Sequence, residues 1–237
     1  MKRIMIFSLA AAGIFGASFV ADTACSNWDF TVGTVTTMTS YDDNGKIQSS
    51  STSTVKKVDA GATKTTVEME SVTNNPKGKE ESRGTVIMTC EDGKIMIDIS
   101  GMIPAENRKE TKGTEYKFEG NMVDYPATMS AGQSLPDVVM IMRAITDGTE
   151  GMTMTYKVVD RKVVARESRT TPAGTYDCFK ITSTNSMAMQ IGPMNVPAMK
   201  PMQSIEWFSF KVGAVRMETH KNDKMMNYSE LTAFKKG

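Results

Sequence analysis

This sequence of 237 residues has few of the side chains that carry common chemistry. It holds a single histidine, His220, which gives no histidine pair for a metal site and reads best as a surface residue. It contains no glycine-rich phosphate loop and no Gly-x-Ser-x-Gly sequence around a nucleophile. Carboxylates are scattered without a distinctive pair. We therefore expect no catalytic residues, no metal and no cofactor.

The chain also lacks an excess of either charge. Its formal net charge is +1, and removal of residues 1–24 takes away Lys2, Arg3 and Asp22, which leaves the rest neutral. A neutral surface has no general attraction for nucleic acid or for anionic lipid headgroups. We therefore expect no nucleic-acid partner.

Long apolar runs are absent except at the start. Lys2 and Arg3 precede an uncharged, mostly apolar run over residues 4–20, and small residues follow as far as Ala24. This order is typical of a secretory signal peptide. The run of about 17 residues is at the lower limit for crossing a bilayer, and no basic cluster follows it. We expect residues 1–24 to be a cleaved signal, the mature chain to have no transmembrane span, and the protein to be exported to the periplasm or associated with the outer membrane.

Only three cysteines are present, Cys25, Cys90 and Cys178. Outside the cytoplasm, one disulfide and one remaining thiol is the usual outcome. Of the three possible pairings we favour Cys25–Cys90, because Cys178 lies in an apolar strand and suits the role of a small buried hydrophobe. Lipidation of Cys25 is an alternative, which Ala24 fits and Asp22 does not. A Cys178 nucleophile with His220 as its base is the weaker interpretation of the remaining thiol.

Helical periodicity is almost absent from residues 25–237, where strands separated by polar turns predominate. Asn44-Gly45 and Asp92-Gly93 are hairpin signals, because both central residues of a type I′ turn need positive φ. Ten or more strands at short spacing predict an all-β fold, with antiparallel strands curled into a barrel, half-barrel or sandwich and little helix. No break in composition divides residues 25–237, so we expect a single antiparallel β domain.

The expected strands can be placed along the chain. Residues 101–113 are expected to form a loop or a short helix, and residues 192–202, with three prolines, a loop. The strands are expected at residues 52–58, 63–72, 85–90, 94–99, 115–120, 138–144, 152–159, 162–169, 176–189, 205–210, 214–220 and 225–234.

Several short motifs in the last third, taken in order, resemble a known family. They are Asp160-Arg161-Lys162-Val163, Glu167, the run from Thr170 to Ile181, Glu206-Trp207, the run from Val212 to Glu218, and Tyr228-Ser229-Glu230-Leu231-Thr232. Earlier residues agree, namely Cys25, Tyr41 to Lys46, Cys90, Ile97-Asp98 and Gly132 to Asp137. The pattern is similar to the TapB-like family of exported Bacteroidota proteins.

The resemblance implies one exported, mostly antiparallel β domain without established catalysis. The family is associated with tetratricopeptide-repeat proteins, which implies a role in binding a protein partner. The family brings no agreed site, so no functional residue is carried over. The motif residues themselves also have structural explanations: Pro172-Ala173-Gly174 forms a turn, Gly213 allows a tight reversal, and Trp207 packs in the core.

Methionine is the one residue type present in unusual number. The chain has 21 methionines, 14 of them between Met122 and Met226. Residues i and i+2 of a strand share a face, so each Met-x-Met pair points one way. Three interpretations remain open: filling of an irregular core, a methionine-lined cavity or face for an apolar ligand or partner, and a Cu(I) site. The pairs are Met140/Met142, Met152/Met154 and Met187/Met189.

Two functional hypotheses follow, both of them non-enzymatic and based on binding in the envelope. The first is an accessory module for a protein partner, with Met194, Met199 and Met202 of the proline-containing loop as contacts. The second is a carrier or chaperone for a lipid-like apolar molecule, with Met152, Met154, Met187 and Met189 lining a cavity.

Overall fold

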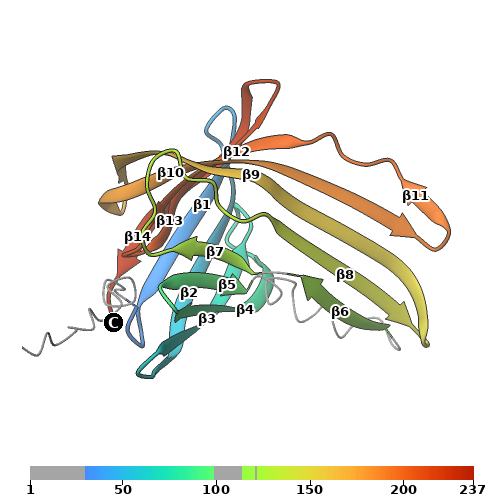
Figure 1. The fold of residues 1–237 in the computed structure, drawn as a ribbon, viewed down its shortest axis with the longest axis horizontal. Helices are drawn as coiled ribbons and strands as arrows, with labels where there is room; N and C mark the ends of the chain where they lie inside the picture. Colours follow the sequence, from blue (N-terminus) through green and yellow to red (C-terminus); the bar gives the residue numbers. More distant parts are fainter. Residues whose placement is uncertain (1–29, 99–113, 121) are drawn as a thin grey trace, which may run out of the picture.

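The computed structural model describes residues 30–98, 114–120 and 122–237, and in these ranges every regular element is a β-strand. Fourteen strands form one antiparallel sheet (Figure 1), which confirms the predicted all-β class. No helix in the described ranges has the length and apolar character needed to cross a bilayer. The expected signal at residues 1–24, Cys25 and the expected loop at residues 101–113 lie outside the described residues.

The strands follow one another along the chain with short connections. They are β1 (Val35–Asp42), β2 (Ile47–Ala60), β3 (Lys64–Asn74), β4 (Glu80–Glu91), β5 (Lys94–Asp98), β6 (Thr114–Gly120), β7 (Val123–Pro126), β8 (Val138–Thr146), β9 (Thr149–Thr171), β10 (Gly174–Ile191), β11 (Met194–Val196), β12 (Met202–Ser209), β13 (Gly213–Lys221) and β14 (Lys224–Lys235).

The two hairpin turns predicted at Asn44-Gly45 and Asp92-Gly93 are present, but their types differ. Asp92 and Gly93 have φ angles of 49° and 70°, as a type I′ turn between β4 and β5 requires. At the β1–β2 turn only Gly45, with φ 78°, is left-handed. The Asp42 carboxylate accepts hydrogen bonds from the backbone N–H of Asn44 at 3.0 Å and of Lys46 at 2.9 Å. This side-chain bonding holds a three-residue loop with glycine in the left-handed position, instead of the expected type I′ turn.

The strand boundaries differ from the expectation in two respects. The strands expected at residues 152–159 and 162–169 are one continuous strand, β9, because a bulge at Asp160, with φ 55°, absorbs the change of register without ending the strand. Strands β1, β7 and β11 were not expected. β11 lies within the proline-containing segment 192–202 and pairs only with the end of β10, where three residues between two prolines carry no strand signal.

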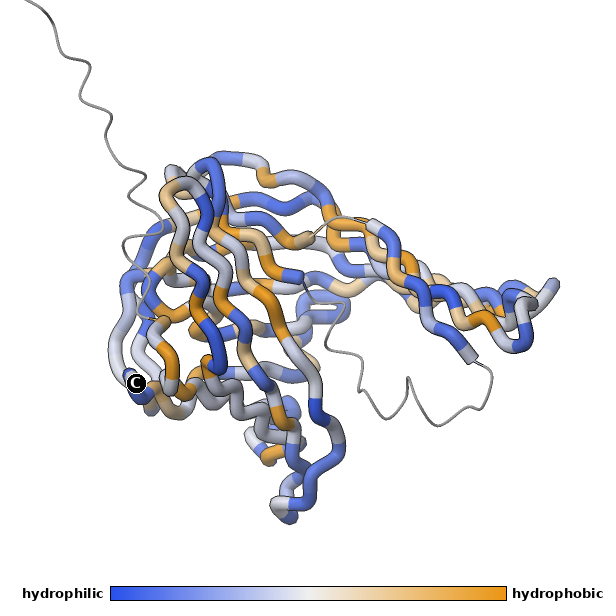
Figure 2. Tube along the Cα trace, turned by 90° about the horizontal axis from the view of Figure 1, so that it is seen from below, coloured by the Kyte–Doolittle hydropathy of each residue, from blue (hydrophilic) through white to orange (hydrophobic). Residues whose placement is uncertain are grey.

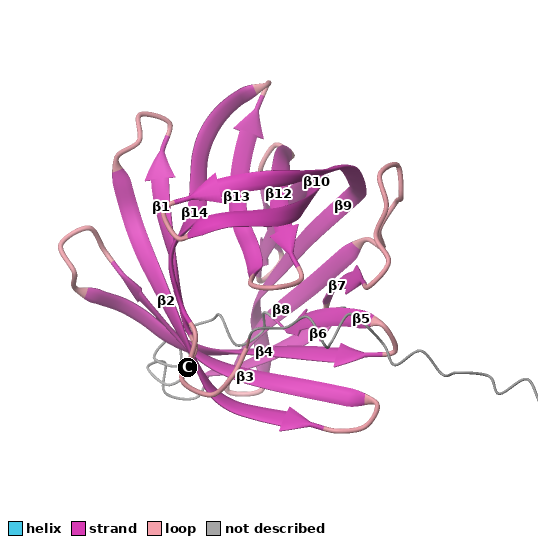
Figure 3. Ribbon diagram, turned by 90° about the vertical axis from the view of Figure 1, so that its left-hand side faces the viewer, coloured by secondary structure: helices cyan, strands magenta, loops and turns pink. Residues whose placement is uncertain are grey.

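The sheet curls so that its two halves face each other (Figure 3). Strands β6 and β7 are the two ends of the strand order, so the sheet is a half-barrel and not a closed barrel. Tyr125 of β7 stacks on Phe208 of β12, with ring centroids 3.9 Å apart. The larger buried cluster therefore combines side chains from both halves, such as Val55, Met88 and Ile181.

Arg161 joins β7 to β9 inside the half-barrel. Its guanidinium donates to Asp124 Oδ1 at 3.2 Å, to the Asp124 backbone oxygen at 3.0 Å and to the Pro136 oxygen at 2.9 Å. The side chain is 2% exposed, and its Cζ lies 5.3 Å from the Tyr125 ring centroid. Tyr125 in turn donates its hydroxyl to Glu206 of β12. We call Asp124, Tyr125, Arg161 and Glu206 the Arg161 cluster; it holds the β7 end of the sheet against β9 and β12.

Part of the sheet extends beyond the half-barrel (Figure 1). This extension, here named the wing, consists of β6, β8, β11 and the segments of β9 and β10 that pair with them, residues 149–158 and 185–191. Hydrophobic and hydrophilic residues alternate along β9 and β10 of the wing (Figure 2). The alternation gives these two strands one apolar face and one polar face, whereas β8 also carries Val139 and Ile141 on its second face.

A second buried cluster surrounds Trp207, which is 3% exposed, so its predicted place in the core is confirmed. Trp207 packs with Cys178, Val215 and Leu231. Its indole N–H donates to Glu167 Oε1 at 2.6 Å. The buried indole therefore has its one donor satisfied, as the stability of a buried tryptophan requires.

Truncation of Trp207 tests how much this second cluster contributes to the free energy of unfolding. We expect Trp207→Ala to lower the free energy of unfolding by about 3–5 kcal/mol, because it empties a packed site. Urea denaturation measures the change. Val164→Ala, at a side chain that is 41% exposed, is the control and should change the free energy of unfolding by less than about 0.5 kcal/mol. Equal effects of the two substitutions would contradict the role given to Trp207.

Removal of the Arg161 charge tests the cluster that bears its name. We expect Arg161→Met to lower the free energy of unfolding by about 3–5 kcal/mol, because Asp124 loses the partner of a buried ion pair. Arg166→Met is the control: Arg166 also pairs with a carboxylate, that of Asp177, but at an exposed site, and the midpoint of thermal unfolding should barely move. A midpoint unchanged in Arg161→Met would show that the cluster does not hold the curl.

Candidate functional site

The inner side of the half-barrel encloses a cavity of about 530 Å³. Both halves of the sheet contribute to its wall, and the described lining holds one cation, Arg161, and one carboxylate, Glu206. The apolar part of the wall includes Met69, Val86 and Met88. Ligand sites of small molecules typically have volumes of about 300–1,000 Å³, so this cavity has the size of a ligand site.

Small hydroxyl side chains keep the cavity open. On β1, β2 and β3 they pair across the strands: Ser51 Oγ lies 2.7 Å from Thr73 Oγ1, and Ser40 Oγ lies 2.7 Å from Ser229 Oγ of β14. These positions face the interior, where large apolar side chains would otherwise fill the curl. Because the hydroxyls bond to each other, the wall is polar without unsatisfied groups at these pairs.

Glu206 forms the acidic part of the wall. The Tyr125 hydroxyl lies 3.0 Å from each of its two carboxylate oxygens. Burial raises the pKa of Glu206 above its usual range, against the opposing effects of the Tyr125 hydrogen bond and the Arg161 charge. Burial and the Glu206 charge raise the pKa of Tyr125 as well. The pair therefore favours proton retention on both groups.

Asn185 lies on β10 where the cavity meets the wing. Its Nδ2 donates to Ser204 Oγ at 2.7 Å, while its buried Oδ1 has no hydrogen-bond partner. An unpaired buried acceptor destabilises the chain by about 1–3 kcal/mol. Because Asn185 also lines the cavity, this oxygen is an unused hydrogen-bond acceptor beside the cavity.

The four predicted ligand-binding methionines come together on the apolar face of the wing. Met154 is directly opposite Met189 and Met142, and Met187 is opposite Tyr156. None of the four is among the described residues that line this cavity, and their role in binding a ligand stays a prediction. We call the half-buried set on this face the methionine face; its members are Met140, Met142, Met152, Met154, Met187 and Met189.

The methionine face continues into the cavity wall. Along β10, Asn185 lines the cavity, and Met187 and Met189 follow on the same face of the strand. Along β9, Tyr156 lines the cavity and Met154 precedes it on the same face. One surface therefore runs from the hydroxyl-lined interior out onto the wing.

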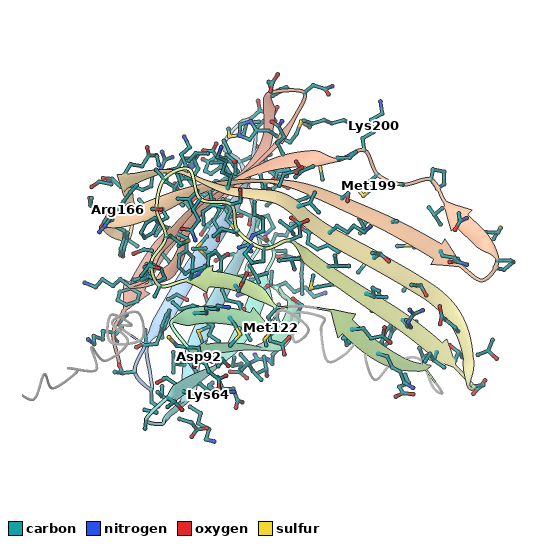
Figure 4. The ribbon with its side chains drawn as sticks, in the orientation of Figure 1. Lys64, Asp92, Met122, Arg166, Met199 and Lys200 are labelled. Carbon is teal, nitrogen blue, oxygen red and sulfur yellow. The ribbon has the colours of Figure 1, made fainter. Side chains whose placement is uncertain are left out.

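The predicted partner-binding residues are not grouped as one loop. Met194 belongs to β11 and is 66% exposed, and Met199 lies in the following connection and is 48% exposed (Figure 4). Met202 is half-buried at the start of β12, opposite Asn185. Met194 is opposite Ile191, which places it beside the methionine face. Their role in binding a partner stays a prediction.

The cysteines and the histidine carry no visible chemistry in the described ranges. Cys178 is a free, buried thiol, as expected, and burial together with the Asp177 charge raises its pKa to about 12, which suppresses the thiolate. His220 lies 3.1 Å from Glu218 Oε2. Cys90 is fully buried in β4, but Cys25 lies outside the described residues, so the Cys25–Cys90 bridge stays a prediction. No cluster of acidic, histidine or cysteine side chains there could hold a metal ion.

Arg161, Tyr125 and Asn185 were not identified from the sequence as site residues. Arg161 and Glu206 do occur in the motifs Asp160-Arg161-Lys162-Val163 and Glu206-Trp207. A charged residue within an apolar strand is the signal that could have identified them. Tyr125 and Asn185 carry no such signal, because their importance depends on partners distant in sequence, Glu206 for Tyr125 and Ser204 for Asn185.

Glu206→Gln tests the raised pKa of Glu206. The folded chain holds this proton more tightly than the unfolded chain, so its contribution to stability is complete below the unfolded pKa of 4.5 and is lost as the pH rises through the folded pKa. Glutamine stays neutral and keeps an acceptor for Tyr125. We expect the stability of the variant relative to wild type to increase as the pH rises above 4.5, measured by urea denaturation at several pH values. Parallel pH curves would show that burial does not shift this group.

Two crystal structures share the fold of the chain. One is a candidate lipoprotein from Parabacteroides distasonis, with a TM-score of 0.70 and 24% identity, in which 88% of this chain and 99% of the other are covered. The other is a candidate exported protein with a YmcC-like fold from Bacteroides fragilis, with a TM-score of 0.66 and 20% identity, covering 88% of this chain and 98% of the other. At this identity the likeness concerns the fold alone.

Sequence similarity identifies the family. No curated protein matches the chain. Residues 31–231, which include every described cavity-lining residue except Phe30, match the DUF3108-like family, and the chain therefore belongs to the DUF3108-like family.

Proposed function

We propose that this protein is an exported binding protein that holds a small molecule with an apolar part between its half-barrel and its wing. The observation that carries the proposal is the 530 Å³ cavity whose wall continues onto the methionine face. A cavity with a mostly apolar wall and a few polar groups is typical of a small-molecule site. The proposed role is binding without catalysis.

The methionine face supplies the adaptable part of the proposed site. Met154 and Met189 are half-buried and lie opposite each other, so a bound molecule would cover thioethers that are now partly exposed. Unbranched, polarisable methionine side chains fit ligands of variable shape. A Cu(I) site is less well supported, because no histidine or cysteine of the described ranges is assigned to this face.

An envelope location is part of the proposal. The signal-like residues 1–24 support export, and the two proteins with this fold are described as a candidate lipoprotein and a candidate exported protein. A soluble carrier of apolar molecules would be useful in that compartment, because such molecules do not cross water unaided. We leave the periplasm and the outer membrane as alternatives.

A protein partner is the second candidate function. Met194, Val196 and Met199 are 66%, 38% and 48% exposed, which makes the end of the wing an exposed apolar surface of the kind that partners cover. The resemblance to the TapB-like family adds a tetratricopeptide-repeat protein as the candidate partner. We favour the small-molecule proposal because it explains the cavity. A partner that contacts only the end of the wing would leave the cavity without a function.

Charge placed on the methionine face tests the first proposal. We expect wild-type protein to enhance the fluorescence of the apolar probe 1-N-phenylnaphthylamine, and the double variant Met187→Glu, Met189→Glu to weaken its affinity at least about tenfold, because two carboxylates would face the apolar probe. The matched control is Ala188→Glu, Gln190→Glu, on the same strand but the opposite face.

The outcomes separate the two functions. Loss of affinity only in the methionine variant supports the small-molecule site. Equal affinity in both variants, or no binding by wild type, contradicts it. The partner hypothesis predicts instead that Met194→Ser, Met199→Ser prevents capture of a partner from envelope extracts while probe affinity is unchanged.

A further inference from the structure

Asn185 marks a change in the chemistry of the inner surface along β10. Before it, Ile181 and Ser183 line the cavity, and Ser204 of the neighbouring strand accepts a hydrogen bond from Asn185. After it on the same face come Met187 and Met189, with no polar side chain between them. A ligand that extends past Asn185 would therefore contact polar side chains of the cavity on one side of this residue and apolar side chains of the wing on the other.

The side-chain oxygen of Asn185 can accept a hydrogen bond that no group of the chain donates. Oδ1 is buried and lacks a partner, while Nδ2 is already used by Ser204. Once a turn of the amide brings this oxygen to the cavity, a ligand hydroxyl or amide N–H would satisfy it, and a carboxylate or a phosphate diester could not, because neither has a proton to donate at neutral pH. The hydroxyls farther inside, such as Ser183, extend the same preference for a head with several hydroxyls.

The charges of the cavity wall disfavour a charged head. Arg161, the one cation of the described lining, directs its hydrogen bonds to Asp124 and Pro136, so its charge is compensated within the chain. Glu206, the one carboxylate, is held by Tyr125. Transfer of a charged head into this cavity would leave its charge unpaired, which is unfavourable.

The methionine face can hold a long apolar chain. From Asn185 to Ile191 the strand advances six residues, or about 20 Å at the usual rise. Met189, Met154 and Met142 lie side by side across three strands, so the apolar surface is several strands wide. It is half-buried and would gain from being covered.

We propose that the ligand is an uncharged amphiphile whose hydroxyl-rich head enters the cavity beside Asn185 and whose apolar chain lies along the methionine face. This inference rests on the proposed function and specifies its ligand class: a neutral lipid or glycolipid with a head such as glycerol or a sugar. Asn185 selects the head, and the methionine face holds the chain without selecting it.

Three probes with the same dodecyl chain test the choice of head. Dodecyl maltoside is uncharged and rich in hydroxyls, dodecyl sulfate is anionic and dodecyltrimethylammonium is cationic. All are added below their micelle-forming concentrations, and displacement of 1-N-phenylnaphthylamine reports their affinities. We expect the maltoside to bind most tightly. Asn185→Leu should weaken the affinity for the maltoside by about five- to tenfold, the effect of one hydrogen bond, when each affinity is corrected for the variant's own affinity for the fluorescent probe.

Controls keep the result interpretable. Thr184→Val changes the neighbouring residue, which points to the opposite face of β10, and should leave all affinities unchanged. Ser183→Ala is the second cavity variant, in case Asn185→Leu does not fold, and should also weaken the maltoside alone. Circular dichroism verifies the fold of each variant.

The outcomes distinguish this inference from the function on which it rests. Suppose that the fluorescent probe binds. Equal affinities for the three dodecyl compounds, or a higher affinity for a charged one, would then overturn the proposal that the ligand has an uncharged head. A maltoside affinity unaffected by both Asn185→Leu and Ser183→Ala overturns the place of the head. Failure of wild type to bind any probe overturns the proposed function and, with it, the ligand class.

Discussion

The rest of the structure depends on the contact between β7 and the strands β9 and β12. An antiparallel sheet of 14 strands buries its inner face only if its two halves approach each other, and hydrogen bonds between strands do not enforce that approach. Arg161, through Asp124 and Pro136, and Tyr125, through Glu206 and Phe208, supply the contact across the interior. This contact includes the buried ion pair of Arg161 and Asp124, and the loss of either partner would destabilise the curl.

The curl creates the site because the inner face is not filled. Serine and threonine occupy positions on β1, β2 and β3 where a closed core would have leucine or phenylalanine, and they bond in pairs across the strands. The larger apolar side chains form the buried cluster that joins the two halves, with members such as Met88, Phe179 and Phe208, and others lie on the wing. Asn185 lies between the polar and the apolar parts, so the arrangement suits a molecule that has both.

The sequence predicts the local structure well and the long-range contacts poorly. Alternation and turn residues are local signals, and they locate most strands and the Asp92-Gly93 hairpin. The same signals divide β9 at Asp160, because a bulge and a turn look alike in sequence. The shared face of Met152 and Met154, or of Met187 and Met189, follows from the period of a strand, but their place on the wing outside the cavity follows from the register of three strands. Asn185 and Tyr125 look ordinary in sequence, since their roles arise from partners 19 and 81 residues away.

Native mass spectrometry of the mature protein, purified from an envelope fraction without detergent, tests the central claim most directly. The account predicts a bound mass that is released on unfolding and identified as an uncharged amphiphile, and its absence from Arg161→Met, in which the curl is weakened. Protein that is folded and empty in every preparation would contradict the claim that the half-barrel and its methionine face form a ligand site.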